Sequence, residues 1–177
     1  RKHKDRPKIV AICDVSGSVA SYVRFLLLFL YALREKVTDL RAFAFSNRLV
    51  DIGRILETQS FESAMTRIID DVGSGSTDYG QALADLQAQH WEVIDRRTTI
   101  LMLGDGRSNY GDPRLDIIEE ATDRAKRLVW LCPEPPSRWG SGDSCMLKYK
   151  PFCSPVSHCA TATDLEQALD DILLAYD

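Results

Sequence analysis

Short runs of apolar and branched side chains alternate along this chain with longer segments in which apolar residues recur at helical spacing. The short runs predict buried strands, and the longer segments predict amphipathic helices. The predicted strands are Lys8 to Cys13, Arg41 to Phe45, Leu49 to Ile52, Thr98 to Leu103, Leu128 to Cys132 and Val156 to Ala160. The predicted helices are Ser18 to Lys36, Phe61 to Asp71, Tyr79 to Gln89, Pro113 to Arg127 and Asp164 to Tyr176. This alternation predicts an α/β fold with a mostly parallel central sheet and helices on both faces.

Residues next to these segments support the predicted boundaries. Asp78 is placed to cap the helix that begins at Tyr79. Asp112 followed by Pro113 has the order expected for a helix cap and a first helical residue. The stretch from Pro133 to Pro151 is rich in Pro and Gly and is predicted to be a long irregular segment.

Composition narrows the class of protein. With 177 residues, of which 45% are hydrophobic, the chain is expected to bury the core of one compact domain without disulfides or structural metals. Its net charge of −4 argues against general attraction to nucleic acid or to an anionic membrane. We expect residues 1–6, which are basic, to be a linker remnant, and residues 7–177 to form the domain. The missing initiator Met suggests a piece of a longer protein.

The longest apolar stretch runs from Phe25 to Leu33 and is bounded by Arg24 and Arg34. It is far shorter than the roughly 20 residues that span a bilayer, so it predicts a buried helix. No signal-peptide pattern is present, and we expect a cytoplasmic protein.

The cysteines are odd in number, which argues against a disulfide framework. Cys132, Cys145, Cys153 and Cys159, with His158, are an alternative zinc cluster. Their spacing contains no C-x-x-C pair of the kind that zinc sites favour, so buried or loop thiols are the preferred interpretation.

Oxygen-bearing side chains gather where the predicted strands end. Asp14, Ser16 and Ser18 form a D-x-S-x-S cluster directly after the first strand, and Thr77 and Asp105 lie on later glycine-flanked loops. Taken alone, the cluster is equally consistent with a turn in which the two serines cap the following helix. The later residues favour a divalent-metal site, because loops at the carboxyl ends of parallel strands meet at one edge of the sheet.

The donor set indicates how such an ion would be used. Two carboxylates and three neutral hydroxyls leave a bound Mg²⁺ incompletely supplied with anionic oxygen, so the ion is expected to bind a carboxylate from a partner. Mn²⁺ and Ca²⁺ remain alternatives. Because Mg²⁺ dehydrates reluctantly, we expect one carboxylate, that of Asp105, to act through water.

Two enzyme-like interpretations compete with this one. A Mg²⁺-dependent phosphohydrolase would use Asp14 as nucleophile, but position 16 is Ser where a second carboxylate is needed, and no phosphate-clamping Lys follows a matching strand. A dinucleotide-binding domain needs G-x-G-x-x-G in the first loop, which is absent. We therefore expect no catalytic residue.

Asp14 to Ser18, Thr77 and Asp105 resemble the metal-ion-dependent adhesion site of von Willebrand factor A domains, over essentially the whole chain. The sequence is most similar to the CoxE-like group, through Leu103-Gly104-Asp105-Gly106-Arg107 and Pro133-Glu134-Pro135. Three further stretches carry this similarity: Pro7 to Ser18, Trp139 to Ser144 and Met146 to Tyr149.

The resemblance implies a Rossmann-like sheet with an ion at its top and the five oxygen-bearing residues as metal ligands. It also implies an adaptor that works with a MoxR-type AAA+ ATPase and a client, such as a molybdenum-containing carbon monoxide dehydrogenase that requires maturation. In that group this domain is usually the C-terminal part of a longer chain.

The irregular segment from Pro133 to Pro151 has no role in the adhesion site itself. Its simplest interpretation is a surface loop. The sharper hypothesis is a second recognition element, with Trp139 and Asp143 as partner-binding residues and the indole as an aromatic anchor.

Overall fold

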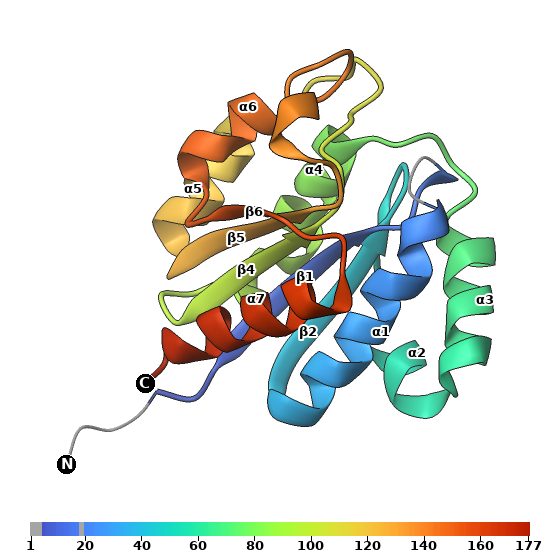
Figure 1. Cartoon of the computed structure of the whole chain (residues 1–177), viewed down its shortest axis with the longest axis vertical. Helices are drawn as coiled ribbons and strands as arrows, with labels where there is room; N and C mark the ends of the chain where they lie inside the picture. Colours follow the sequence, from blue (N-terminus) through green and yellow to red (C-terminus); the bar gives the residue numbers. More distant parts are fainter. Residues whose placement is uncertain (1–4, 18–19) are drawn as a thin grey trace.

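A six-stranded sheet runs through the centre of the molecule. The computed structural model describes residues 5–17 and 20–177, and its sheet has the order β3-β2-β1-β4-β5-β6 (Figure 1). The strands are β1 (Lys8–Asp14), β2 (Asp39–Phe45), β3 (Leu49–Asp51), β4 (Thr98–Leu103), β5 (Arg127–Cys132) and β6 (Val156–His158). All neighbouring strands are parallel except β2 and β3, which are antiparallel. The predicted α/β fold is therefore confirmed.

Helices cover both faces of this sheet. The helices are α1 (Ala20–Lys36), α2 (Gly53–Thr58), α3 (Phe61–Val72), α4 (Tyr79–His90), α5 (Leu115–Arg124), α6 (Met146–Tyr149) and α7 (Ala162–Leu174). Helices α1, α3 and α7 pack on one face, and α4, α5 and α6 pack on the other (Figure 1).

The two faces bury two hydrophobic cores, and β1 contributes to both. Ile9, Ala11 and Cys13 point into one core, whereas Val10 and Ile12 point into the other, and all five are at most 2% exposed. A strand buried on both faces needs a continuous apolar run, which is the pattern that the sequence shows.

The sequence-based boundaries were wrong at α5. The helix begins at Leu115 rather than Pro113, because Arg114 has a left-handed backbone with φ of 50° that cannot belong to a right-handed helix. Asp112 does not cap α5; its carboxylate accepts the backbone N–H of Arg114 instead. At the other end Arg127 belongs to β5.

Short elements account for the other differences. Helix α2 was not predicted, and the segment expected to be irregular contains α6 and two 3₁₀ turns, Pro136–Arg138 and Lys150–Phe152. The last strand ends at His158 rather than Ala160. In the described part of the chain no helix is long and apolar enough to cross a membrane.

The topology singles out the carboxyl ends of β1 and β4. From β1 the chain first builds β2 and β3 on one side and later β4, β5 and β6 on the other, so the strand order reverses between β1 and β4. In open parallel sheets, ligands bind outside the carboxyl ends of the strands at such a point. The loops after β1 and β4 are those that contain Asp14 to Ser18 and Asp105.

Candidate metal centre

Asp14 is the last residue of β1 and is completely buried. Its Oδ1 accepts the backbone N–H of Ser16 at 2.9 Å, and its Oδ2 accepts the hydroxyl of Tyr79 at 2.9 Å. Burial raises the pKa of the carboxyl above its usual range, and the hydrogen bonds from Ser16 and Tyr79 oppose that rise. The side chain is therefore held in one orientation at the top of the sheet.

Tyr79 was not recognised from the sequence, although it directly follows the helix cap Asp78. Its ring is buried, and the ring centroid lies 4.8 Å from that of Phe45 and 5.7 Å from that of Trp130. These contacts fix the position of the hydroxyl group. Besides donating to Asp14, this hydroxyl accepts the backbone N–H of Gly106 at 3.1 Å. Burial raises the pKa of Tyr79 well above its usual value, so the hydroxyl stays protonated and remains a donor.

Asp105 follows β4 and is 3% exposed. Its Oδ1 accepts the backbone N–H of Arg107 at 2.9 Å. Burial raises the pKa of Asp105 to about 7, and the negative charge of Asp14 is the second cause. The two buried carboxylates therefore lie close enough to repel each other.

Gly104 is the residue that lets the loop after β4 approach the Asp14 loop. A Cβ atom at this position would lie 2.2 Å from the hydroxyl oxygen of Tyr79 and 2.8 Å from the Cβ atom of Asp14. Any side chain at position 104 would therefore push the loop after β4 away from Tyr79 and Asp14. The sequence shows a glycine here but not the contact that requires it.

The three predicted loops meet around one pocket of about 300 Å³. Gly17 comes from the first loop, Thr77 from the second and Arg107 from the third. The complete lining is Gly17, Gly75, Ser76, Thr77, Arg107, Asn109 and Asp143. Thr77 is half-buried in its wall, and Ser16, next to Gly17, is 1% exposed. Ser18, the remaining predicted ligand, lies outside the described residues.

The residues present fit a divalent cation. Two buried carboxylates with raised pKa values need positive charge nearby to ionise, and a divalent ion supplies it. Among the described residues no three His, Cys, Asp or Glu side chains cluster as a metal site. The donors here are instead two carboxylates together with hydroxyls, a set that suits Mg²⁺, Mn²⁺ or Ca²⁺.

Comparison with known proteins identifies the family. A model of the family described as "VWA domain containing CoxE-like protein" matches residues 1–168. The chain belongs to this family. A search of curated proteins finds no match.

Solved structures with the same fold have little sequence in common with this VWA domain. Proximal thread matrix protein 1 from the mussel byssus, described "with zinc occupied MIDAS motif", is 14% identical with a TM-score of 0.64, over 95% of this chain and 47% of that one. A von Willebrand factor type A protein from Catenulispora acidiphila is 14% identical with a TM-score of 0.63, over 97% and 43%. BatB from Bacteroides thetaiotaomicron is 11% identical with a TM-score of 0.64, over 96% and 98%. The chain thus spans about half the length of the first two, and these likenesses show the fold.

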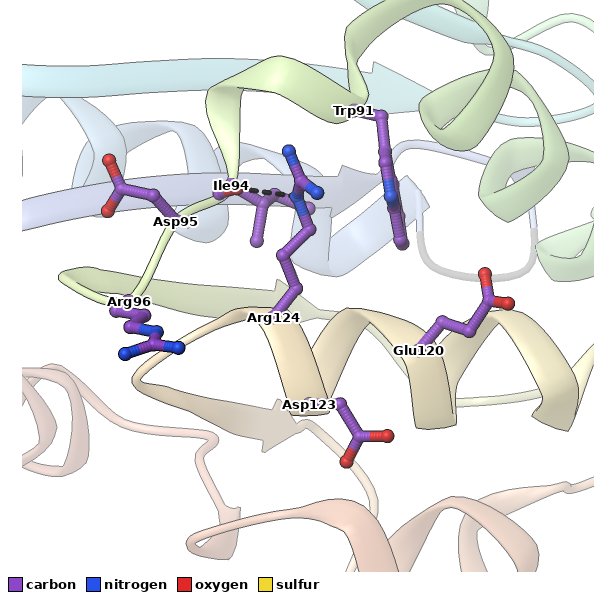
Figure 2. Close-up of a pocket in the computed structure, with 7 residues that line it drawn as sticks. All are labelled: Trp91, Ile94, Asp95, Arg96, Glu120, Asp123 and Arg124. Atoms are coloured by element: carbon purple, nitrogen blue, oxygen red, sulfur yellow. Dashed lines mark hydrogen bonds between the residues drawn. The ribbon is translucent and has the colours of Figure 1, made fainter.

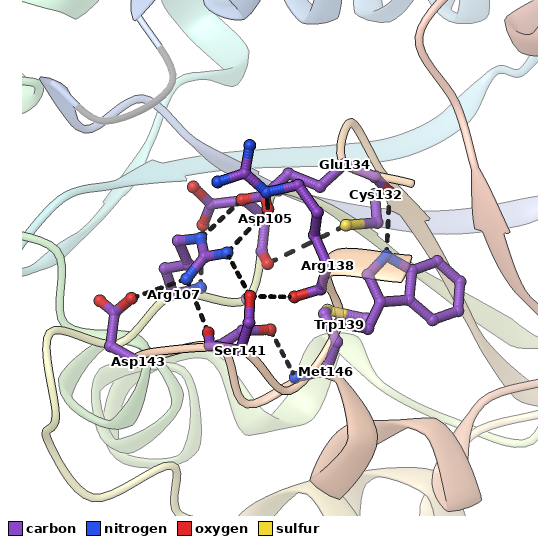
Figure 3. A network of polar contacts seen from close by, with 12 residues as sticks. Asp105, Arg107, Cys132, Glu134, Arg138, Trp139, Ser141, Asp143 and Met146 are labelled. Carbon is purple, nitrogen blue, oxygen red and sulfur yellow. Dashed lines mark hydrogen bonds and ion pairs between the residues drawn. The ribbon is translucent and has the colours of Figure 1, made fainter. Parts of the chain in front are cut away.

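A network of polar contacts joins the loop that follows β4 to the segment that follows β5 (Figure 3). Arg107 binds both oxygens of Glu134, at 2.6 and 2.8 Å, and Oδ1 of Asp143 at 3.0 Å. It also donates to the carbonyl oxygen of Ser141 at 2.9 Å. Arg107, which the sequence analysis did not single out, therefore fixes one wall of the pocket.

Both predicted partner-binding residues make contacts within the chain. Trp139 is half-buried against the core beneath it, and its indole N–H donates to the carbonyl oxygen of Glu134 at 2.9 Å. Asp143 accepts the guanidinium of Arg107 with one oxygen and the backbone N–H of Asn109 with the other. These contacts give both residues a structural role.

All five cysteines are free thiols. Burial raises the pKa values of Cys132 and Cys153 to about 12 and that of Cys159 to about 11, so these thiols are protonated in the metal-free protein. Among the described residues no zinc cluster forms from them.

A larger hollow of about 640 Å³ lies at the other end of the sheet, where α5 ends and β4 begins (Figure 2). Arg124 extends across it, donates to the carbonyl oxygen of Ile94 at 2.7 Å and lies 5.8 Å over the ring of Trp91. These contacts hold α5 against the preceding turn. They give this hollow a structural role and no chemistry.

Replacing Tyr79 by Phe is expected to weaken Mn²⁺ binding by about 10- to 100-fold, the usual cost of removing a group that orients a ligand. The ring keeps its aromatic contacts, but Asp14 Oδ2 loses its donor. Isothermal titration with MnCl₂ measures the effect. Tyr31→Phe is the matched control, because it removes a partly buried hydroxyl that donates to the carbonyl oxygen of Gln59, away from this site. Equal Mn²⁺ affinity in both variants would contradict the role of Tyr79.

Proposed function

We propose that this VWA domain is a protein-interaction module that binds a carboxylate of a partner protein through a divalent ion. One observation carries the proposal: the loops that follow Asp14 and Asp105 and the loop of Thr77 converge around one pocket, and the two buried carboxylates at the bases of those loops repel each other. Asp14, Ser16, Ser18, Thr77 and Asp105 are the proposed metal ligands. The zinc-occupied MIDAS motif of the mussel byssus protein supports the same use of this fold.

Charge explains why the ion would then attract a partner. Two carboxylates balance the two positive charges of Mg²⁺ without completing its preference for anionic and water oxygens. With the ion bound, a carboxylate from a partner would add a strong electrostatic contact in a partly desolvated pocket. Mg²⁺ is the ion we propose, with Mn²⁺ or Ca²⁺ as substitutes.

The finer proposal concerns the partner. Membership of the CoxE-like family supports an adaptor that links a MoxR-type AAA+ ATPase to a molybdenum hydroxylase under maturation, such as carbon monoxide dehydrogenase. We place this work in the cytoplasm and assign the domain no catalysis of its own.

The geometry does not favour the phosphohydrolase alternative. Position 16, where a second carboxylate would be needed, is a serine that is 1% exposed. The described residues that line the pocket include no lysine to clamp a phosphate. Hydrolysis of p-nitrophenyl phosphate that disappears in Asp14→Asn would overturn this conclusion.

Binding to the ATPase is expected to require both the ion and Asp14. A pull-down with a MoxR-type ATPase from the same organism should recover complex in MgCl₂, and at least tenfold less in EDTA or with Asp14→Ala. Asp170→Ala, which removes an exposed carboxylate on α7, is the matched control and should bind like the wild type. If EDTA and Asp14→Ala each leave the recovery at the level of the wild type in MgCl₂, the proposal is wrong.

A further inference from the structure

The loop after β4 displays an aromatic side chain next to the metal pocket. Tyr110 is 81% exposed, more than any other large apolar side chain in the described part of the chain. It directly follows Asn109, which lines the pocket. Isolated exposed apolar residues are common on proteins, so exposure alone assigns nothing.

The backbone beneath Tyr110 distinguishes it from a casual surface residue. Asn109 and Tyr110 both have left-handed φ values, 50° and 60°. Asn tolerates this conformation, but Tyr is disfavoured there because its Cβ atom crowds the backbone. Strained residues of this kind persist where the surrounding structure holds them, and they concentrate at binding sites.

The surrounding structure does hold this loop. The side chain of Asp143 accepts the backbone N–H of Asn109 at 3.1 Å, and its carbonyl oxygen accepts that of Ser108 at 3.4 Å. The backbone N–H of Cys145 donates to the carbonyl oxygen of Gly106 at 2.8 Å. The segments on either side of these bonds run side by side above the sheet (Figure 1). The loop is therefore ordered in the absence of a partner, so less conformational entropy is lost on binding.

Electrostatics indicates what lies against the ring. A Cβ atom on Gly142 would be 3.4 Å from Arg107 Nη1 and 3.9 Å from Tyr110 Oη, so the hydroxyl end of the ring and the guanidinium flank the same glycine. Arg107 is already paired with Glu134 and Asp143, so its charge is engaged within the chain and does not call for a charged partner side chain there. An apolar side chain needs no charge partner and gains the burial of both surfaces.

We propose that Tyr110 is the apolar anchor of the partner-binding surface, and that the partner is a peptide segment combining a carboxylate for the ion with an apolar side chain for the ring. This inference rests on the proposed function and assigns it a specificity element. It replaces Trp139, whose indole is already engaged within the chain, as the aromatic contact. Asp143 then acts as the brace that positions Tyr110.

Selection from short random peptides displayed on phage tests the proposal. The whole chain is immobilised in MgCl₂, and bound phage are eluted with EDTA. The wild type is expected to enrich peptides with Asp or Glu at a constant spacing from an aliphatic or aromatic residue. Tyr110→Ser is expected to keep the acidic residue, lose the apolar one, and bind the best wild-type peptide about tenfold or more weakly.

Control variants distinguish the role of Tyr110 from the proposed metal-dependent binding of a carboxylate. Tyr110→Phe and Leu174→Ser, which alters another exposed apolar residue at the far end of α7, should select the wild-type peptides. Titration with MnCl₂ should give Tyr110→Ser the wild-type affinity for the ion alone. The role of Tyr110 as anchor is wrong if Tyr110→Ser selects the same peptides with the same affinity. It is also wrong if the wild type enriches cationic residues, rather than apolar ones, at the constant spacing from the acidic residue. If no acidic, Mg²⁺-dependent peptide is enriched at all, the proposed function fails and the anchor fails with it.

Discussion

Replacing Asp14 by Asn is expected to weaken Mn²⁺ binding by more than about 100-fold while making the metal-free domain more stable at about pH 8. The first effect follows because the variant loses one of only two carboxylates proposed to hold the ion. The second follows because Asp14 and Asp105 are both buried and repel each other. A neutral amide of the same shape removes that repulsion and the cost of burying the charge.

The contacts of Asp14 predict that this variant folds. The amide oxygen of Asn can still accept the backbone N–H of Ser16, and its NH₂ group can donate to the hydroxyl oxygen of Tyr79, which has a second lone pair. The O–H of Tyr79 then loses its acceptor, which offsets part of the gain from removing the buried charge. We expect the free energy of unfolding in EDTA to rise by about 1 to 3 kcal/mol. Urea unfolding in EDTA measures it, and isothermal titration with MnCl₂ measures the ion.

A variant that binds the ion more weakly but is more stable without it would show that the charge of Asp14 serves ion binding and not folding. Asp170→Asn, on the exposed surface of α7, should change neither quantity. A variant at position 14 that binds Mn²⁺ like the wild type would remove Asp14 from the metal site. A variant that loses both ion binding and stability would show that Asp14 stabilises the fold through its hydrogen bonds.

The sequence predicts the sheet well because β1, β4 and β5 are buried on both faces and so are continuous apolar runs. It fails where local rules compete with distant contacts. Pro113 is a favourable first helical residue, yet Arg114 adopts a left-handed backbone and delays α5. Helix α2 has one fully buried residue, Leu56, which is too little periodicity to reveal it.

The residues of the candidate site also fall into two groups, those that the sequence predicts and those that only the folded structure reveals. The oxygen ligands can be found because they follow strand ends at the carboxyl edge of the sheet, a position fixed by topology. Tyr79 cannot be found this way, since its contact with Asp14 joins residues that are 65 positions apart. A glycine is needed at position 104 because of where Tyr79 and Asp14 lie. Side chains that orient ligands depend on the completed fold, whereas the ligands depend on local pattern.

The sequence also could not predict which aromatic side chain near the site is exposed to solvent. Trp139 and Tyr110 both lie on glycine-containing segments near the site, and composition favours the indole as an anchor. The structure half-buries Trp139 and leaves Tyr110 81% exposed. Contacts within the chain hold both residues: Trp139 donates to the carbonyl oxygen of Glu134, and Asp143 accepts the backbone N–H of Asn109 beside Tyr110.

The stability of the metal-free domain is expected to fall as pH rises from about 4 to about 7, and a divalent ion should cancel that fall. Burial and the charge of Asp14 raise the pKa of Asp105 to about 7, whereas the unfolded chain ionises near the usual 3.8. The folded state therefore binds the proton more tightly. Its contribution to stability is complete below about pH 4 and is lost as pH rises through about 7, by an amount on the order of a few kcal/mol.

Other acidic groups act in a different pH range. Hydrogen bonds, from Lys8 to Asp95 and from the backbone of Ala160 to Asp164, lower the pKa values of these two carboxyls below 3.8. Their stabilising effect is present above that pH and is lost only in stronger acid. The range from about pH 5 to about pH 8 consequently reports on the buried carboxylates at the metal site.

Urea unfolding at a series of pH values in EDTA, repeated in saturating MgCl₂, measures both parts of this prediction. The free energy of unfolding should decline with pH in EDTA and stay nearly level in MgCl₂, because the ion binds the ionised carboxylates and favours the folded state. Asp105→Asn should flatten the decline in EDTA. A decline that persists unchanged in this variant would mean that the buried carboxylate after β4 is not the group that a metal ion neutralises.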